Sequence, residues 1–278
     1  MDRLDADHVG RPPLHLHAAR GGRRLSRRPG RPSTRHLLVP LLLTLGVLLA
    51  ACGSSAPAAP PANQGLALDR PTPQHIRLID QHGRPVSLAA LRGKVVVLAP
   101  FLSLCQDECP LITAAYTSLQ RDVHAAGLSH RVAFVEATVD PGRDTVARLV
   151  AYQKEFGASW DLWTGTPAQI AAFWRPFGVS YQIVPEEQPP KTDWWTGQPL
   201  TYDVDHTDGY IIIDANGRER FVDAGAPDIP DLSPKLKSLL DDGGLHDLTH
   251  PQPTSWTTAD LLASLSWVLG TNVGAAGS

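Results

Sequence analysis

The sequence is short of the sulfur-containing residues on which several classes of small protein depend. Among its 278 residues there are three cysteines, and the single methionine stands at position 1. Three cysteines are too few for a disulfide framework, and they lack zinc-ribbon spacing. Without methionines in the body of the chain, a site for a soft metal ion cannot use thioethers, which leaves thiolate and imidazole.

Positive charge is also scarce after the first 51 residues. Residues 1–51 carry nine arginines and three aspartates, whereas the rest of the chain has 16 basic and 25 acidic residues. Nucleic-acid binding needs a basic face, so the acidic remainder argues against nucleic acid as a partner. An acidic surface of this kind suits a basic or metal-bearing partner.

The apolar run from Leu37 to Ala51 is too short for an ordinary membrane-spanning helix, which needs about 20 residues. Its arginine-rich lead is typical of a signal peptide. The run ends in Leu-Ala-Ala-Cys52-Gly-Ser, which resembles a bacterial lipobox. The resemblance implies that Cys52 receives a diacylglyceryl thioether and becomes the mature N-terminus. The alternative is an uncleaved anchor helix, and both interpretations tether the domain to the extracytoplasmic face of the bacterial cell membrane.

Composition and pattern divide the chain into four parts. The Pro/Ala-rich stretch after Cys52 cannot support a packed core and is interpreted as a linker. The predicted parts are a lipoprotein signal peptide at 1–51, the linker at 52–73, a folded domain at 74–243 and a C-terminal extension at 244–278, in which Leu261 to Leu269 is a candidate helix.

Between residues 74 and 243, strand and helix patterns follow one another as in an α/β domain with a mixed sheet. The β-branched run 94–99 predicts a strand buried on both faces, and Asn216-Gly217 predicts a hairpin turn. Asp144 is a candidate N-cap for the helix that follows it. The predicted strands are 76–80, 85–88, 94–99, 131–139, 202–205, 210–214 and 219–222, and the predicted helices are 110–126, 145–156, 168–177 and, closing the domain, 230–242.

Cys105 and Cys109 lie on the turn between a predicted buried strand and a predicted helix. Pro110 suits the first helical position, because the amide that proline lacks would be unpaired there. Cys109 would then stand near the helix N-terminus, whose dipole favours a thiolate. Two such thiolates are soft ligands for Cu(I), and they could equally close a disulfide. A structural disulfide, or two thiols of the core, is the simpler alternative.

The motif around these cysteines resembles the copper site of the Sco/SenC family of cytochrome oxidase assembly factors. The C-x3-C-P pattern and Asp107 match the family, whereas Gln106 stands where proline is common. The stretch 138–145 resembles the family's VDP-x-RDT motif, and 202–217 resembles the segment that bears the third ligand. The likeness spans about Ile76 to Leu240. It implies a thioredoxin-like fold with an extra β-hairpin, and a copper ion held by Cys105, Cys109 and His206.

His206 is assigned mainly from this likeness. Taken alone, one histidine in the turn between two predicted strands is more simply a surface residue. The chain has 11 histidines, of which four precede Cys52. His246 and His250 are interpreted as solvated, with a weak second metal site as the alternative. The remaining histidines lie away from the cysteine turn: His75, His82, His124 and His130.

The resemblance implies a copper metallochaperone, not an enzyme. It would take copper from extracytoplasmic copper or thiol donors and deliver it to the dinuclear copper centre of cytochrome c oxidase subunit II. The alternative is a thiol–disulfide oxidoreductase that uses Cys105 and Cys109 to reduce the cysteines of that centre. Thioredoxins, however, carry C-x2-C opposite a cis-proline, and here Asp205-His206-Thr207 occupies that turn. A peroxiredoxin is disfavoured because Leu102 stands where that family has threonine.

Overall fold

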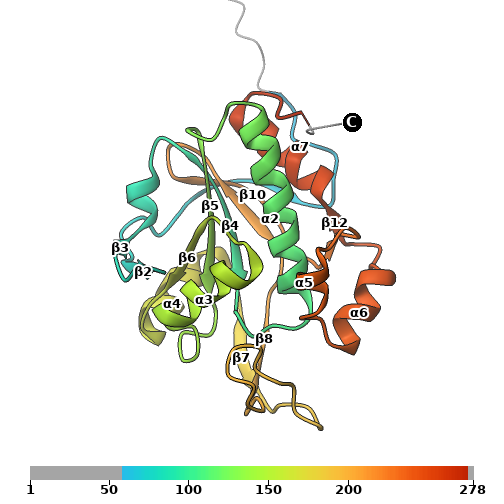
Figure 1. Cartoon of the computed structure of the whole chain (residues 1–278). Helices are drawn as coiled ribbons and strands as arrows, with labels where there is room; N and C mark the ends of the chain where they lie inside the picture. Colours follow the sequence, from blue (N-terminus) through green and yellow to red (C-terminus); the bar gives the residue numbers. More distant parts are fainter. Residues whose placement is uncertain (1–57, 275–278) are drawn as a thin grey trace, which may run out of the picture. The chain divides into compact units, whose positions relative to one another are not determined.

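The centre of the molecule is a mixed sheet of eight strands (Figure 1). The computed structural model describes residues 58–274. In spatial order the strands are β1 (Leu66–Pro71), β10 (Arg218–Asp223), β9 (Tyr210–Ile213), β4 (Val95–Phe101), β5 (Val132–Thr138), β6 (Asp161–Thr164), β2 (Leu78–Asp80) and β3 (Pro85–Val86). β4, β5 and β6 run parallel to one another. β9 runs antiparallel to its neighbour β4, and β10 runs antiparallel to β9.

β4 is the strand that the sequence identifies most directly. All seven of its residues are buried, as the continuous β-branched run predicts for a central strand covered on both faces. The predicted hairpins β2–β3 and β9–β10 are present. This strand order, with a helix after β4 and another after β10, is that of a thioredoxin-like fold, so the predicted fold class is confirmed.

Two helices pack against each other and against the central strands: α2 (Glu108–Ala125) contacts β5, and α7 (Thr258–Leu269) contacts β4, β9 and β10. Two further helices provide the connections on either side of β6: α3 (Val146–Phe156) and α4 (Pro167–Trp174), the latter continued by a 3-10 turn η2 (Arg175–Phe177). A second 3-10 turn, η1 (Leu88–Leu91), precedes β4. No helix in the range 58–274 is long and apolar enough to cross a membrane.

A separate two-stranded hairpin, β7 (Tyr181–Val184) with β8 (Asp203–His206), projects from the sheet end at which β4 leads into α2 (Figure 1). The strand predicted before His206 is therefore present, but it pairs with β7 and not with the central sheet. We call residues 181–206, which comprise the two strands and the long connection between them, the hairpin arm.

The chain between β10 and α7 forms a long loop whose two ends are held together; we call this loop, residues 229–255, the excursion. β11 (Pro227–Asp228) and β12 (Trp256–Thr257) pair in parallel, so residues 229–255 leave the body and return to the same place. This excursion carries α5 (Pro234–Lys237) and α6 (Asp242–Thr249). The prediction of one closing helix over 230–242 is wrong, because four residues of that range form α5 and the helix that closes the domain is α7.

Both ends of the domain differ from the boundaries expected from composition. Leu66–Pro71, within the segment interpreted as linker, forms β1 and pairs with β10. At the other end, α7 packs on the sheet and buries Leu261, Leu265 and Leu269, so the extension belongs to the core. The described fold therefore begins before residue 74 and ends after residue 243.

Candidate metal centre

The cysteine turn joins the buried strand β4 to α2, as predicted, but the helix begins two residues earlier than Pro110. α2 starts at Glu108, so the backbone amide of Cys109 lies in its first turn and donates to Cys105 Sγ at 3.3 Å. Cys109 is buried and Cys105 is partly exposed, and both are free thiols. The helix N-terminus therefore points its amide at Cys105.

This geometry reverses the roles expected for the two thiols. The hydrogen bond from the Cys109 thiol, supported by His206 and by the Cys109 amide, lowers the pKa of Cys105 well below its usual value although burial opposes this. Burial and the neighbouring Cys105 raise the pKa of Cys109. The expectation that the helix dipole favours a Cys109 thiolate is wrong, because Cys109 is buried and its thiol and first-turn amide both donate to Cys105, which favours the charge there.

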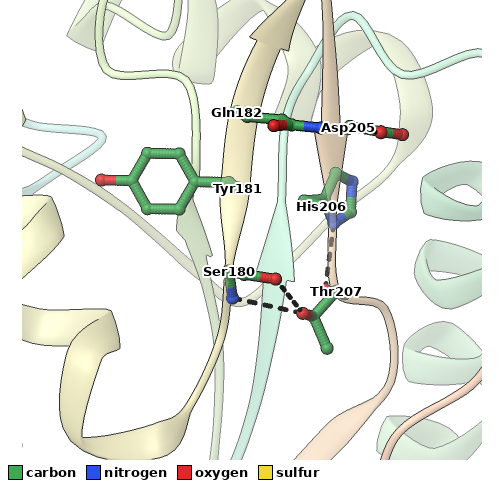
Figure 2. Close-up of a pocket in the computed structure, with 6 residues that line it drawn as sticks. All are labelled: Ser180, Tyr181, Gln182, Asp205, His206 and Thr207. Carbon is green, nitrogen blue, oxygen red and sulfur yellow. Dashed lines mark hydrogen bonds between the residues drawn. The ribbon is translucent and has the colours of Figure 1, made fainter.

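His206 ends β8 and brings its ring to the cysteines. Nε2 lies 3.8 Å from Cys109 Sγ, while Nδ1 lies 3.1 Å from the carbonyl oxygen of Thr207 and 3.4 Å from Asp208 Oδ1. Burial alone would lower the pKa of His206, but the Cys105 thiolate and Asp208 raise it to about 9. Figure 2 shows the ring on β8 beside β7, where Thr207 is bonded to Ser180. The side chain of His206 is only 5% exposed.

The three side chains predicted as ligands meet at one place. Cys105 Sγ, Cys109 Sγ and a ring nitrogen of His206 all lie within 4.8 Å of one another. Two sulfurs and one imidazole nitrogen are a donor set for a soft metal ion. The same two sulfurs are close enough for thiol–disulfide chemistry. Cys52 lies outside the described residues, so the structure does not bear on its predicted lipid.

The other predicted histidines are not part of this centre. All six are exposed and none belongs to a group of three metal-ligand side chains in the described part of the chain: His75, His82, His124, His130, His246 and His250. His246 and His250 stack on each other on α6, with ring centroids 4.4 Å apart. They are solvated, as the sequence predicts.

The turn 140–145 secures the cysteine side of the centre through Asp144. This carboxylate is buried and accepts hydrogen bonds from the backbone amide of Ser103 at 3.2 Å, from the Ser103 hydroxyl and from Thr138 Oγ1 at 2.5 Å. Ser103 precedes Cys105 by two residues. The predicted N-cap role of Asp144 is wrong: Thr145 caps α3, accepting from the amide of Arg148, because the Asp144 carboxylate is directed toward the cysteine turn.

Arg143 secures the histidine side of the centre from the same turn. It pairs with Asp140, and its NH1 donates to the carbonyl oxygen of Tyr202 at 2.7 Å. Its guanidinium also lies 3.7 Å from the centroid of the Tyr202 ring, whose hydroxyl donates to Asp140. Tyr202 leads directly into β8. One turn thus holds both segments that carry the candidate ligands.

Carboxyl groups surround the centre. Burial, followed by the charge of Cys105, raises the pKa of Asp107 to about 7. Burial and Asp208 raise that of Glu108 to about 9, and burial raises that of Asp208 to about 6. A cavity of 170 Å³ beside the cysteines is lined by these groups, by Asp203 and Asp205, and by one lysine, Lys191. The acidic lining favours a cation over an anion as the incoming species.

Sequence reasoning missed the residues that join the cysteine turn to the rest of the molecule. Gln106 stands where proline is common in the family, and its side chain donates to the carbonyl oxygen of Thr192 at 2.8 Å. Its own carbonyl oxygen accepts from the amide of Asp241 at 2.8 Å. These contacts come from the hairpin arm and from the excursion, and no local pattern marks them.

Comparison with known proteins gives a consistent result. The family model described as SCO1/SenC matches residues 67–241. An SCO2-like protein of Rickettsia prowazekii is 27% identical over 205 residues, covering 70% of this chain and 93% of its own length. A SCO1/SenC family lipoprotein of Bacillus anthracis, of known structure, is 25% identical with a TM-score of 0.47, covering 66% and 96% of the two chains. ScoI of Bradyrhizobium japonicum, solved with copper bound, is 24% identical with a TM-score of 0.44, covering 67% and 99%.

Proposed function

This chain belongs to the SCO1/SenC family, and we propose that it is a copper chaperone that binds one copper ion through Cys105, Cys109 and His206. Its target is the dinuclear copper centre of cytochrome c oxidase subunit II. The observation that carries the proposal is the meeting of two sulfurs and one imidazole nitrogen within 4.8 Å. They come from segments about 100 residues apart in the sequence, so their meeting is a property of the fold.

The ligand chemistry suits a cargo ion that is bound and then released. Cu(I) is soft and favours thiolates, and three donors leave an edge through which an incoming thiolate can displace one donor at a time. Cys105 is the partly exposed donor and faces the acidic cavity. Because the ligands must be deprotonated, copper binding releases protons from Cys109 and from the His206 imidazolium.

The asymmetry of the two thiols supports a second candidate function, reduction of a disulfide in the target. The Cys105 thiolate would attack the disulfide and form a mixed disulfide with one target sulfur, while the other leaves as a thiolate. Cys109, after losing its proton, would then displace the target sulfur. The target ends as two thiols and this chain ends as the Cys105–Cys109 disulfide, so two electrons pass to the target.

We place this activity at the extracytoplasmic face of the bacterial cell membrane. The support is sequence evidence: the lipobox-like segment at Cys52 after an apolar run of 15 residues. There the chain would receive copper from extracytoplasmic copper or thiol donors, and its thiols would need a reductant to stay available for metal.

One titration separates the two functions. The reduced full-length chain is titrated anaerobically with Cu(I) against a competing chelator, alongside the variants His206→Ala and, as a control, His130→Ala. The chaperone predicts tight one-to-one binding that His206→Ala abolishes and His130→Ala leaves unchanged. Binding that is indifferent to His206→Ala, with disulfide reductase activity intact, would favour the oxidoreductase.

A further inference from the structure

Lys191 lies in the hairpin arm and links it to the excursion. Its Nζ lies 2.9 Å from Asp203 Oδ2 and 2.9 Å from Asp241 Oδ2. The side chain is 16% exposed, and burial alone would lower its pKa, but the bonds to Asp241 and Asp203 raise it above the usual value. The carbonyl oxygen of Lys191 accepts from the amide of Leu200, which fixes its backbone within the arm. The ammonium group is therefore fixed in place by its two ion pairs and its backbone contact.

Each carboxylate bound by Lys191 belongs to a segment that reaches one side of the metal centre. Asp203 lies on β8, three residues before His206. Asp241 uses its backbone amide to bond the carbonyl oxygen of Gln106, the residue after Cys105. The contacts therefore run without a break from Cys105–Gln106 through Asp241 and Lys191 to Asp203 and His206.

The excursion also packs directly on the cysteine turn. A Cβ added at Gly244 would lie 2.7 Å from the carbonyl oxygen of Gln106 and 3.0 Å from Cα of Asp107, so the two backbones approach as closely as glycine allows. Asp241 caps α6 by accepting from the amide of Gly244 at 2.9 Å. The turn that carries Cys105 is thus covered by a segment whose own position is fixed through Asp241.

We propose that Lys191 is a positioning residue for the metal centre. Through its ion pairs with Asp241 and Asp203 it fixes the Cys105–Cys109 turn and the His206 strand relative to each other. This inference rests on the proposed function. The centre draws its ligands from two separate segments, so its affinity for a metal ion depends on how far the fold has already brought those segments together. Contacts just outside a metal's ligands act in this way.

A purely electrostatic role for Lys191 predicts the opposite sign. An ammonium lining the cavity beside Cys105 and His206 repels an incoming copper cation. Its removal by Lys191→Met would then strengthen copper binding. A positioning role predicts weaker binding, because the two ligand-bearing segments lose their shared partner. The direction of the change therefore distinguishes the two.

The test uses the full-length chain and four single variants. Lys191→Met removes both bonds, and Lys191→Arg keeps the charge. Asp241→Asn removes one charge of the pair and keeps a side chain suited to capping α6. Lys235→Met is the matched control, because Lys235 also links the excursion to the body, through Glu155 at 3.0 Å, but touches neither ligand segment. Cu(I) affinity, Cu(II)–thiolate absorption and the Tm of the metal-free chain are measured for each.

We expect Cu(I) binding to weaken about ten-fold or more in Lys191→Met, within the range for residues that orient metal ligands. The thiolate absorption should shift, Lys191→Arg should restore part of the affinity, and Lys235→Met should match the wild type in affinity whatever its Tm. Unchanged or tighter binding in Lys191→Met would overturn the inference while leaving the chaperone in place. Loss of binding in Lys235→Met equal to that in Lys191→Met would also overturn it.

Gly244→Ala keeps the test decisive if Lys191→Met does not fold. The added methyl group forces the excursion away from Gln106 without altering any charge, so it should weaken Cu(I) binding in the same direction. Normal affinity in Gly244→Ala together with Asp241→Asn would contradict the inference. A wild-type chain that binds no copper would overturn the proposed function and this inference together. A wild-type chain that binds copper, with unchanged binding in the variants, would overturn the inference alone.

Discussion

The buried carboxylate of Asp144 accepts hydrogen bonds from both the backbone amide and the hydroxyl of Ser103, two residues before Cys105. It also accepts from Thr138 on β5. A single side chain thus ties the start of the cysteine turn to the neighbouring strand of the sheet. The consequence is that the position of Cys105 depends on a residue that is not itself a ligand.

Replacing Asp144 by alanine should destabilise the protein and weaken copper binding together. The change leaves the amide and hydroxyl of Ser103 and the hydroxyl of Thr138 without this acceptor, and each such buried group costs about 1–3 kcal/mol. We expect the free energy of unfolding, measured by urea denaturation, to fall by about 2–4 kcal/mol. Asp231→Ala, at an exposed position, is the control, and equal stability of the two variants would refute this role.

Arg143 should act on the opposite side of the centre. Arg143→Met removes the bond to the Tyr202 carbonyl oxygen and the contact with the Tyr202 ring, both just before β8. His206 then loses support, and we expect Cu(I) affinity to fall about ten-fold in a chelator competition. Arg121, whose side chain is 67% exposed on α2, supplies the control variant Arg121→Met. Identical affinities for the two variants would exclude this role for Arg143.

The sequence predicts those features that depend on neighbouring residues. The all-buried strand β4, the Asn216-Gly217 turn and the helices predicted at 110–126 and 145–156 follow from local pattern, and the structure contains them, with α2 beginning two residues earlier. The place of Cys105 between strand and helix follows in the same way, whereas Cys109 lies in the first turn of α2. His206 needed the family likeness, because one histidine in a turn carries no local signal for metal binding.

The features that were missed depend on contacts between distant residues. β1 has the composition of a linker and becomes a strand only because β10, about 150 residues later, pairs with it. The excursion is defined by the pairing of β11 with β12, two residues each, which is too short for a periodic pattern. The thiolate was assigned to the wrong cysteine because burial of Cys109 and its hydrogen bonds to Cys105, together with distant His206, decide which thiol ionises.

The buried carboxyl group of Glu136 should make stability depend on pH. Burial raises its pKa to about 8, although Trp160 Nε1, which donates to Oε2 at 2.8 Å, and Thr113 both lower it. The native state therefore holds a proton that the unfolded chain, with an ordinary pKa near 4.5, releases earlier. Between these values the free energy of unfolding should fall as pH rises, by at most about 1.4 kcal/mol per pH unit.

Glu136→Gln should remove this part of the pH dependence. Its amide oxygen can accept from Trp160 as the carboxyl does, and it has no proton to lose. We expect the variant to match the wild type near pH 5 and to exceed it in stability near pH 9, as measured by denaturant titration at each pH. The exposed Glu155→Gln variant is the control. Parallel curves for wild type and Glu136→Gln would refute the prediction.

The final prediction concerns the membrane attachment proposed at Cys52. Expressed in bacteria and extracted from membranes, the chain should begin at Cys52 and carry a lipid on its thiol, as intact-mass spectrometry would show. Cys52→Ala should carry no lipid, whereas Cys105→Ala should be lipidated like the wild type, because the modification depends on the lipobox-like segment and not on thiols in general. A wild-type chain that retains residues 1–51 with an unmodified Cys52 would support the alternative, in which Leu37 to Ala51 serves as an uncleaved anchor.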